Sequence, residues 1–244
     1  MLLWRREKDV DKIRNDIVYG DRNDPKKFPF ADVILKYAYQ IICTHDVFDK
    51  RGMCVSLESF NFNPKDVLKL ISIDDYLTFL IYNLEYKALI LEQLSEERER
   101  ALLAKCKERN ADPPENYGVM LQVCIIRDLT GLGWNHMSSE AKAIIGACLK
   151  IGLNHYSDFM SKSIVINAPW IFDVMWAFVK LFLEPSTIAK NSVTGKDYRA
   201  KLLEDLPKES IPVQYGGTYE VTYTLLIVFP SIFLRDDLIN DHVM

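Results

Sequence analysis

The sequence predicts an α/β domain with a mixed, mainly parallel sheet and flanking helices. Two short apolar runs, residues 119–126 and 163–167, are typical of buried strands. Each run is followed by a segment with helical spacing of apolar residues, at 138–153 and 170–183. Parallel strands need a long crossover connection, usually a helix, so this alternation favours a layered α/β domain.

The N-terminal half completes the predicted layout. Residues 1–18 are expected to form a helix and residues 31–38 a helical turn. Residues 39–48 and 53–57 read as a hairpin around the turn 49–52, and residues 72–109 as one long helix whose charged stretch faces solvent. Shorter elements are expected near the C-terminus: a strand at 188–193, a helix at 197–206 and a strand at 213–215.

Composition excludes several classes of protein. With 30 basic and 34 acidic residues, the net charge of −4 argues against a nucleic-acid binder. Five dispersed cysteines without a C-x-x-C unit predict neither a disulfide framework nor a zinc cluster, and indicate a reducing compartment. The most apolar stretch, residues 164–183, contains Asn167, Pro169, Asp173 and Lys180, so we expect a soluble, cytoplasmic chain.

No catalytic constellation is visible in the sequence. A G-x-S-x-G elbow is absent, and Gly131-Leu132-Gly133 lacks the third glycine of a dinucleotide fingerprint because His136 stands there. The four histidines form no i, i+4 pair. We therefore expect neither an enzyme nor a metal or cofactor other than a bound ligand.

Four motifs occur in a fixed order in the second half of the chain, preceded by the turn Asp49-Lys50-Arg51-Gly52. They are Asp128-Leu129-Thr130-Gly131, the run I-V-I-N-A-P at 164–169, the run F-L-E-P-S-T-I-A-K at 182–190, and a Leu206-Pro207 step followed by I-P-V-Q-Y-G-G at 211–217.

In this order, the motifs resemble those of the CRAL-TRIO lipid-binding domain, the fold of the phosphatidylinositol/phosphatidylcholine transfer proteins. The resemblance implies a sheet and helices that enclose an apolar lipid cavity. It also implies that residues 1–30 are the remnant of an N-terminal helical segment and that residues 31–244 form the lipid-binding domain. The tail after Gly217, including its apolar run at 225–229, is expected to be a core strand or a packing segment and has no assigned role.

The resemblance assigns the apolar segment 170–183 as the mobile gate helix over the lipid cavity. From the residues alone, a helix that is apolar on nearly all sides is either a core helix or one that meets a membrane. The predicted gate and acyl-chain residues are Trp170, Phe172, Trp176, Phe178, Phe182, Val123 and Ile125. Phosphatidylcholine-binding relatives carry hydroxyl residues where Val123 and Ile125 stand, which disfavours a choline lipid here.

Three further residues are implied to hold the lipid headgroup. Thr187 and Lys190 match the positions that contact a phosphoinositide headgroup, and their spacing places both on one helix face. Asp158 stands where such proteins keep an acidic residue near that headgroup. From spacing alone, a capping threonine, a solvated lysine and a surface acid remain equally simple interpretations.

We therefore expect a protein that binds one phospholipid, most simply phosphatidylinositol, and exchanges it during transient membrane contact. A sterol, retinoid or tocopherol ligand is the first alternative, and a membrane-lipid-sensing interaction module without transfer activity is the second. Localisation is expected to be cytoplasmic and peripheral at membranes, with no nucleic-acid partner. The sequence is silent on the oligomeric state.

Overall fold

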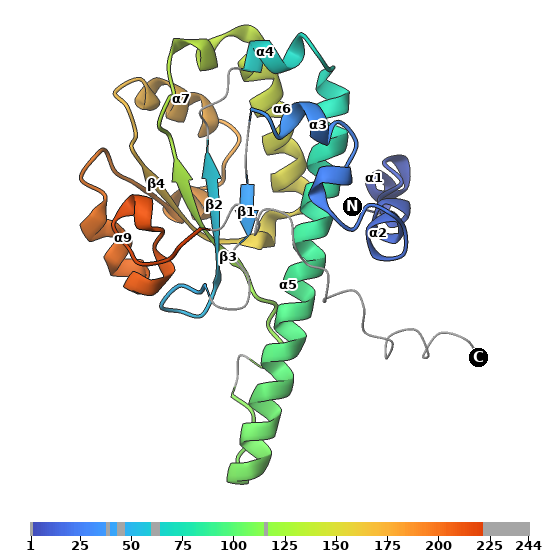
Figure 1. Cartoon of the computed structure of the whole chain (residues 1–244), viewed down its shortest axis with the longest axis vertical. Helices are drawn as coiled ribbons and strands as arrows, with labels where there is room; N and C mark the ends of the chain where they lie inside the picture. The colour runs from blue at the N-terminus through green and yellow to red at the C-terminus, as the bar shows by residue number, and fades with distance from the viewer. Residues whose placement is uncertain (1, 38–39, 43–46, 60–63, 115–116, 222–244) are drawn as a thin grey trace.

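A five-stranded sheet lies at the centre of the molecule, with helices on both of its faces (Figure 1). The computed structural model describes residues 2–37, 40–42, 47–59, 64–114 and 117–221. The strands stand in chain order across the sheet: β1 Gln40–Ile42, β2 Cys54–Ser59, β3 Val123–Asp128, β4 Met160–Ile166 and β5 Asn191–Val193. Among the strands of the described residues, only the β1–β2 pair is antiparallel. The mixed, mainly parallel sheet predicted from the sequence is confirmed.

The helices connect and cover these strands. The α-helices are α1 Leu2–Glu7, α2 Val10–Val18, α3 Ala31–Ile34, α4 Pro64–Leu68, α5 Ile73–Arg109, α6 Ser139–His155, α7 Phe172–Val179, α8 Pro185–Ala189 and α9 Arg199–Asp205. Short 3-10 turns are η1 Pro25–Lys27, η2 Trp134–Met137, η3 Ser157–Phe159, η4 Lys208–Ser210 and η5 Val213–Tyr215.

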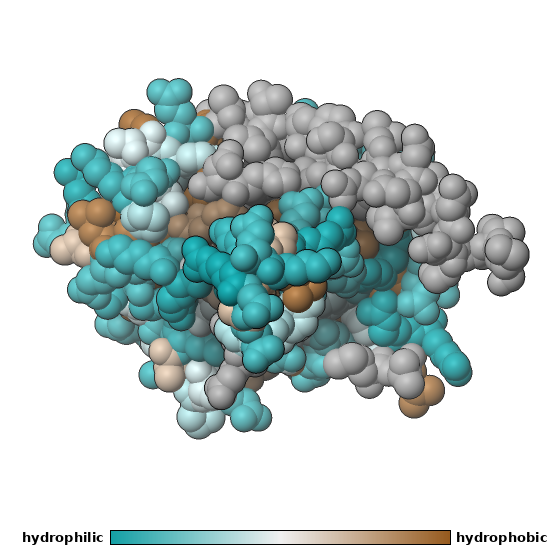
Figure 2. Space-filling model, turned by 90° about the horizontal axis from the view of Figure 1, so that it is seen from below, coloured by the Kyte–Doolittle hydropathy of each residue, from teal (hydrophilic) through white to brown (hydrophobic). Residues whose placement is uncertain are grey.

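Helix α5 is the longest element, and both of its ends carry clear stop signals. Ser72 and Asp75 form a capping box at its start, and Asn110 ends it in the left-handed region at φ 50°. Its C-terminal end projects beyond the sheet (Figure 1), and the molecule seen from that end is mostly hydrophilic (Figure 2). The predicted helix and its solvated charged end are confirmed.

The two faces of the sheet pack against different helices because side chains alternate along each strand. We call the first the α5 face. Glu58 on this face pairs with Lys87 of α5, and Ile125 packs with the buried apolar residues of the same helix. We call the second the α9 face; Cys124, Ile126 and Ile164 pack there with Leu202 of α9.

The α5 face continues beneath α7. Val165 of β4 lies in register with Arg127 of β3, and both side chains point to this face. Val165 packs with Phe172 and Met175 of α7 and with Leu129. Helices α5 and α7 therefore cover adjacent parts of one sheet face.

The carboxylate of Asp128 joins three segments that are distant in sequence. Its Oδ1 accepts hydrogen bonds from the Thr130 backbone N–H at 2.9 Å, the Thr130 hydroxyl at 2.7 Å and Asn167 Nδ2 at 2.9 Å, while its Oδ2 accepts from the Tyr215 hydroxyl at 2.8 Å. Burial disfavours the charged form, but these hydrogen bonds outweigh it and lower the pKa of Asp128. Three of the four sequence motifs thus meet at one charge.

Several predicted elements have different bounds. The expected helix over residues 1–18 is two helices, because Asp9 takes a left-handed conformation at φ 49° between α1 and α2. The strand expected at 119–126 begins only at Val123, and the strand expected at 163–167 runs from Met160 to Ile166. Asn167 ends β4 at φ 54°, where its side chain is held by Asp128.

Three C-terminal predictions are wrong in type or length. The helix expected at 170–183 spans only Phe172–Val179, and a separate helix starts at Pro185 after the extended Glu184. The first half of the strand expected at 188–193 is the end of α8 and the residue that caps it, and only the second half forms a strand, β5. Residues 213–215 form a 3-10 turn that Gly216 ends at φ 90°, so they form no strand. The hairpin residues 43–46 and the run 225–229 lie outside the described residues.

Replacing Asp128 should destabilise the fold more than removing any one of its partners. In Asp128→Asn, an N–H₂ donor replaces an oxygen that accepts hydrogen bonds, so we expect a loss of about 2 kcal/mol and a Tm lower by roughly 4–8 °C. Tyr215→Phe removes one hydrogen bond and should cost about 1 kcal/mol. Thermal and urea unfolding measure both; an Asp128→Asn variant as stable as Tyr215→Phe would contradict the central role of this carboxylate.

The stability difference between wild type and Asp128→Asn should also depend on pH. Because the pKa of Asp128 is lowered in the folded state, its charge stabilises the protein above its ordinary pKa. That contribution is lost as the pH falls from about 4 through the lowered pKa. We expect the stability gap between wild type and Asp128→Asn to be full at pH 7 and to shrink below about pH 4 in urea titrations.

Candidate functional site

Helix α7 packs one side against the sheet. Phe172 and Met175 are 6% and 7% exposed and contact Val165 beneath them. Trp176, half-buried, stacks on Phe172 with ring centroids 5.7 Å apart. This side of the predicted gate helix is an ordinary apolar contact with the α5 face.

The other side of α7 and the segment before it expose large apolar side chains. Trp170 is 73% exposed, Val174 50% and Leu181 80%. Trp134 of η2, which follows β3, is 65% exposed and meets Trp170 edge to face at 5.6 Å. Trp170 precedes the helix and was wrongly placed on it by the sequence pattern, and Trp134 was not singled out. We call these four residues the tryptophan surface.

The remaining predicted gate aromatics, Phe178 and Phe182, are half-buried beside α6. Their rings lie 5.3 Å apart, and Lys142 of α6 places its Nζ 6.0 Å from the Phe178 ring. A Cβ added at Gly146 would lie 3.4 Å from Phe182 Cζ, so the glycine lets α6 approach closely. Helix α6 thus borders the predicted gate on one side.

Val123 and Ile125 are buried on the α5 face in a different cluster from the α7 aromatics. Their neighbours there include Leu91 of α5 and Ile151 of α6. The structure therefore separates the predicted acyl-chain residues into two groups, one beneath α5 and α6 and one at α7. Their role toward a lipid stays a prediction.

The three predicted headgroup residues gather around the start of β4. Lys190, directly after α8, donates from Nζ to the Met160 carbonyl at 2.9 Å. Thr187 lies three residues earlier in α8, and its hydroxyl makes no hydrogen bond to the described residues. Asp158 lies in η3, just before Met160, with an exposed side chain and a carbonyl that accepts from Gln122 Nε2 at 2.7 Å. Their headgroup role stays a prediction.

A buried ionic cluster on the α5 face was missed in the sequence. Glu58 of β2 accepts from Arg127 Nε of β3 at 3.0 Å and from Lys87 Nζ of α5 at 3.4 Å. Burial opposes the charge of this carboxylate, but attraction to the two cations outweighs it and lowers the pKa of Glu58. The available signal was Arg127 itself, a charge inside an otherwise apolar strand.

Two titratable side chains mark a low-dielectric region between α5 and α6. Tyr76 and Cys148 both keep some accessible surface. Burial nevertheless raises the pKa of Cys148 to about 12 and also raises the pKa of Tyr76, on which the charge of Glu58 acts as well.

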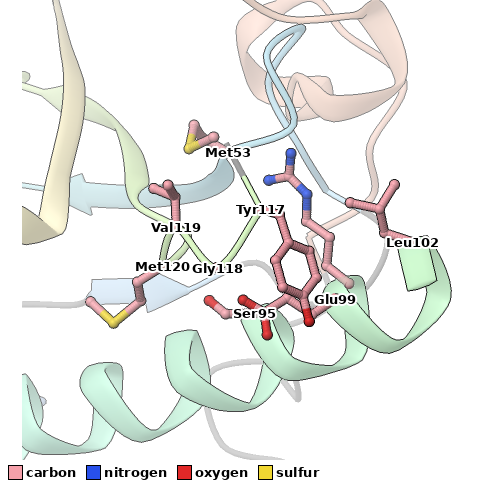
Figure 3. Close-up of a pocket in the computed structure, with 9 residues that line it drawn as sticks. Met53, Ser95, Glu99, Leu102, Tyr117, Gly118, Val119 and Met120 are labelled. Carbon is pink, nitrogen blue, oxygen red and sulfur yellow. The ribbon is translucent and has the colours of Figure 1, made fainter. Parts of the chain in front are cut away.

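A pocket beside the C-terminal half of α5 lies between this helix and residues 117–120, which precede β3 (Figure 3). Ser95 and Glu99 of α5 face Tyr117 and Gly118 across it. The Ser95 hydroxyl accepts from the Leu121 backbone N–H at 2.8 Å and so fixes this wall. No predicted site residue lines this pocket.

The described residues contain no group of three His, Cys, Asp or Glu side chains placed to hold a metal ion. Within the same ranges, no helix is both long and apolar enough to cross a bilayer.

The N-terminal helices are tied to the main core by one buried carboxylate. Glu85 of α5 accepts from Arg5 at 3.3 Å, Arg14 at 3.2 Å and the Tyr156 hydroxyl at 2.6 Å. Trp4 stacks on His155 with centroids 3.7 Å apart. Residues 2–30 and the following residues therefore share a core, and the boundary at residue 30 stays a prediction.

The sequences of several characterised proteins align with most of this chain. A phosphatidylinositol/phosphatidylcholine transfer protein, SFH4 of Arabidopsis thaliana, is 28% identical over 224 residues, which cover 89% of this chain and 31% of that protein. SEC14 cytosolic factors of Eremothecium gossypii and Schizosaccharomyces pombe are each 27% identical, covering 90% and 88% of this chain and 62% and 65% of the relatives. The chain thus spans 31% to 65% of the lengths of these relatives.

The fold and the family agree. The crystal structure of Sfh5 matches with a TM-score of 0.51 and 16% identity, covering 78% of this chain and 54% of the other. The sequence profile of the CRAL/TRIO domain matches residues 37–217, which is most of the chain. Because this profile matches most of the chain, the chain belongs to the CRAL/TRIO domain family.

Proposed function

We propose that this protein binds a single phospholipid, most simply phosphatidylinositol, and exchanges it between membranes as a cytoplasmic, peripherally associated carrier. The observation that carries the proposal is the exposed apolar surface on and beside α7. The helix packs on the sheet through Phe172 and Met175, while Val174 and the flanking Trp170 and Leu181 stay exposed. Packing on the sheet needs only the first set, so the exposed set indicates a further apolar partner.

A lipid chain has a large energetic reason to enter such a site. Burying a CH₂ group stabilises by roughly 0.8 kcal/mol, so a ~16-carbon chain gains on the order of 13 kcal/mol over water. The acyl chain would lie between the α5 face and α7. Half-buried Trp176 and Phe182 would contact it with little change in the surrounding fold.

The headgroup would bind at the start of β4. The Thr187 hydroxyl and the Lys190 ammonium are placed within one turn of chain and are suited to a phosphate. Asp158 would orient the inositol hydroxyls from η3. A choline lipid is disfavoured because Val123 and Ile125 offer no hydroxyl donor.

Membrane contact would occur through the tryptophan surface, Trp134, Trp170, Val174 and Leu181. Indole rings favour the membrane–water interface, where one edge is apolar and the other is wet. The two indoles touch each other and follow two adjacent strands, so they would enter the interface together.

The headgroup assignment predicts a selective loss of phosphatidylinositol. In Thr187→Ala/Lys190→Ala, two hydrogen bonds to a charged phosphate disappear, so affinity should fall at least about tenfold. Native mass spectrometry after incubation with mixed vesicles, followed by organic extraction, measures the bound lipid. Ser186→Ala/Lys196→Ala is the matched control, since it removes an exposed hydroxyl and an exposed ammonium nearby.

The alternatives give distinct results in this experiment. Retention of a sterol, retinoid or tocopherol that ignores both variants would replace the phosphoinositide with another apolar ligand. If the wild-type protein binds vesicles but carries no lipid after it is separated from them, a lipid-sensing interaction module would be favoured.

The tryptophan surface predicts a loss of vesicle binding without a loss of fold. In Trp134→Ala/Trp170→Ala, most of the exposed aromatic area is gone, so vesicle affinity should fall about tenfold or more. Cosedimentation measures the affinity, and the blue shift of tryptophan fluorescence on vesicle addition should largely vanish. Tyr19→Ala/Leu203→Ala removes exposed apolar groups on other faces and should bind like wild type.

A further inference from the structure

The cluster of Glu58, Arg127 and Lys87 lies on the sheet face that the proposed lipid would contact. The side chains of Glu58 and Lys87 are 10% and 9% exposed, and that of Arg127 is 30% exposed. Burying charges in this way is weak as a source of stability, because well-packed apolar residues of similar volume usually serve a core as well or better. The cluster therefore calls for a role beyond packing.

The guanidinium of Arg127 is held on one side and open on the other. Its Nε donates to Glu58 Oε2 at 3.0 Å, which fixes the orientation of the planar group. Its two terminal nitrogens make no hydrogen bond to any residue in the described part of the chain. In register with Arg127 lies Val165, which α7 covers, so Arg127 stands on the same sheet face directly beside the part that α7 covers.

A second polar group without a partner lies one step away on the same face. Ser163 of β4 is 0% exposed, and its hydroxyl forms no hydrogen bond with the described residues. Ser163 pairs with Ile125, two residues before Arg127, so the two side chains are diagonal neighbours. An unsatisfied buried hydroxyl costs about 1–3 kcal/mol, which a ligand oxygen would recover.

We propose that Arg127 and Ser163 form an internal anion site that receives the terminal carboxylate or phosphate of an acidic amphipathic lipid. Two parallel N–H groups of a guanidinium match two oxygens of either anion, and the serine hydroxyl donates a third hydrogen bond. Glu58 acts as a positioning residue that fixes the guanidinium. This inference rests on the proposed lipid-binding function and adds a second ligand class to it.

The test compares lipids with and without a terminal anion. Wild-type protein is incubated with phosphatidylcholine vesicles that contain oleate, dioleoylphosphatidate or phosphatidylinositol, re-isolated, and its bound lipid quantified by mass spectrometry. Wild type should take up oleate or phosphatidate at least about tenfold in preference to phosphatidylcholine. Preference between oleate and phosphatidate then identifies the anion as carboxylate or phosphate.

Three variants separate a ligand role from a structural one. Ser163→Ala removes an unpartnered buried hydroxyl and its desolvation cost, so the lipid-free Tm should stay the same or rise while anionic-lipid affinity falls about tenfold. Arg127→Met combined with Glu58→Gln removes one charge of each sign and should lower that affinity more than tenfold, with phosphatidylcholine uptake unchanged. Arg127→Lys keeps the positive charge without the paired donors, so its anionic-lipid affinity should lie between that of wild type and that of Arg127→Met/Glu58→Gln.

The outcomes distinguish this inference from the proposed function. If folded Ser163→Ala and Arg127→Met/Glu58→Gln both bind oleate and phosphatidate like wild type, the anion site is wrong. If phosphatidylinositol uptake still depends on Lys190 in that case, the proposed function survives alone. Wild type that takes up no lipid from any vesicle overturns both.

Discussion

The hydrogen bonds to the Asp128 carboxylate hold together the end of the molecule at which β3 and β4 terminate. This carboxylate fixes the carboxyl ends of β3 and β4 to each other through Asn167, and fixes both to the C-terminal turn through Tyr215. The segments carrying Trp134 and Trp170 start within a few residues of Asp128 and Asn167. The position of the proposed membrane surface therefore follows from one half-buried charge and its hydrogen bonds.

Side chains alternate along β3, so one side of the strand contributes to the apolar core and the other to the proposed ligand site. Cys124 and Ile126 complete the apolar α9 face, which holds the fold together. Ile125 and Arg127 point to the other face, where we place the ligand. A slip of one residue would exchange these sets and bury Arg127 against α9, so the register of this strand is the strictest constraint on the site.

Local pattern was sufficient to predict much of this architecture, whereas long-range pairing was not accessible to it. Helix α5 follows from its caps and spacing, and the parallel strands follow from short apolar runs between helices. The apolar composition of residues 170–183 hid the end of α7 at Val179, because the residues that follow it are as apolar as the helix itself. The ionic cluster joins β2, β3 and α5, and the sequence contains nothing that specifies which carboxylate Arg127 meets. The headgroup residues were reached through family resemblance, since Thr187 and Lys190 alone read as surface residues.

The two proposed polar sites lie at different heights along β4, and this has a consequence for the ligand. Lys190 binds the carbonyl of Met160, whereas Arg127 stands in register with Val165. Five residues of strand separate these points by about 16 Å. A lipid with one polar end reaches only one of them while its chain fills the remaining apolar surface. Headgroup chemistry would then select the orientation of the lipid: an inositol phosphate toward the start of β4, and a small terminal anion toward Arg127 beneath α7.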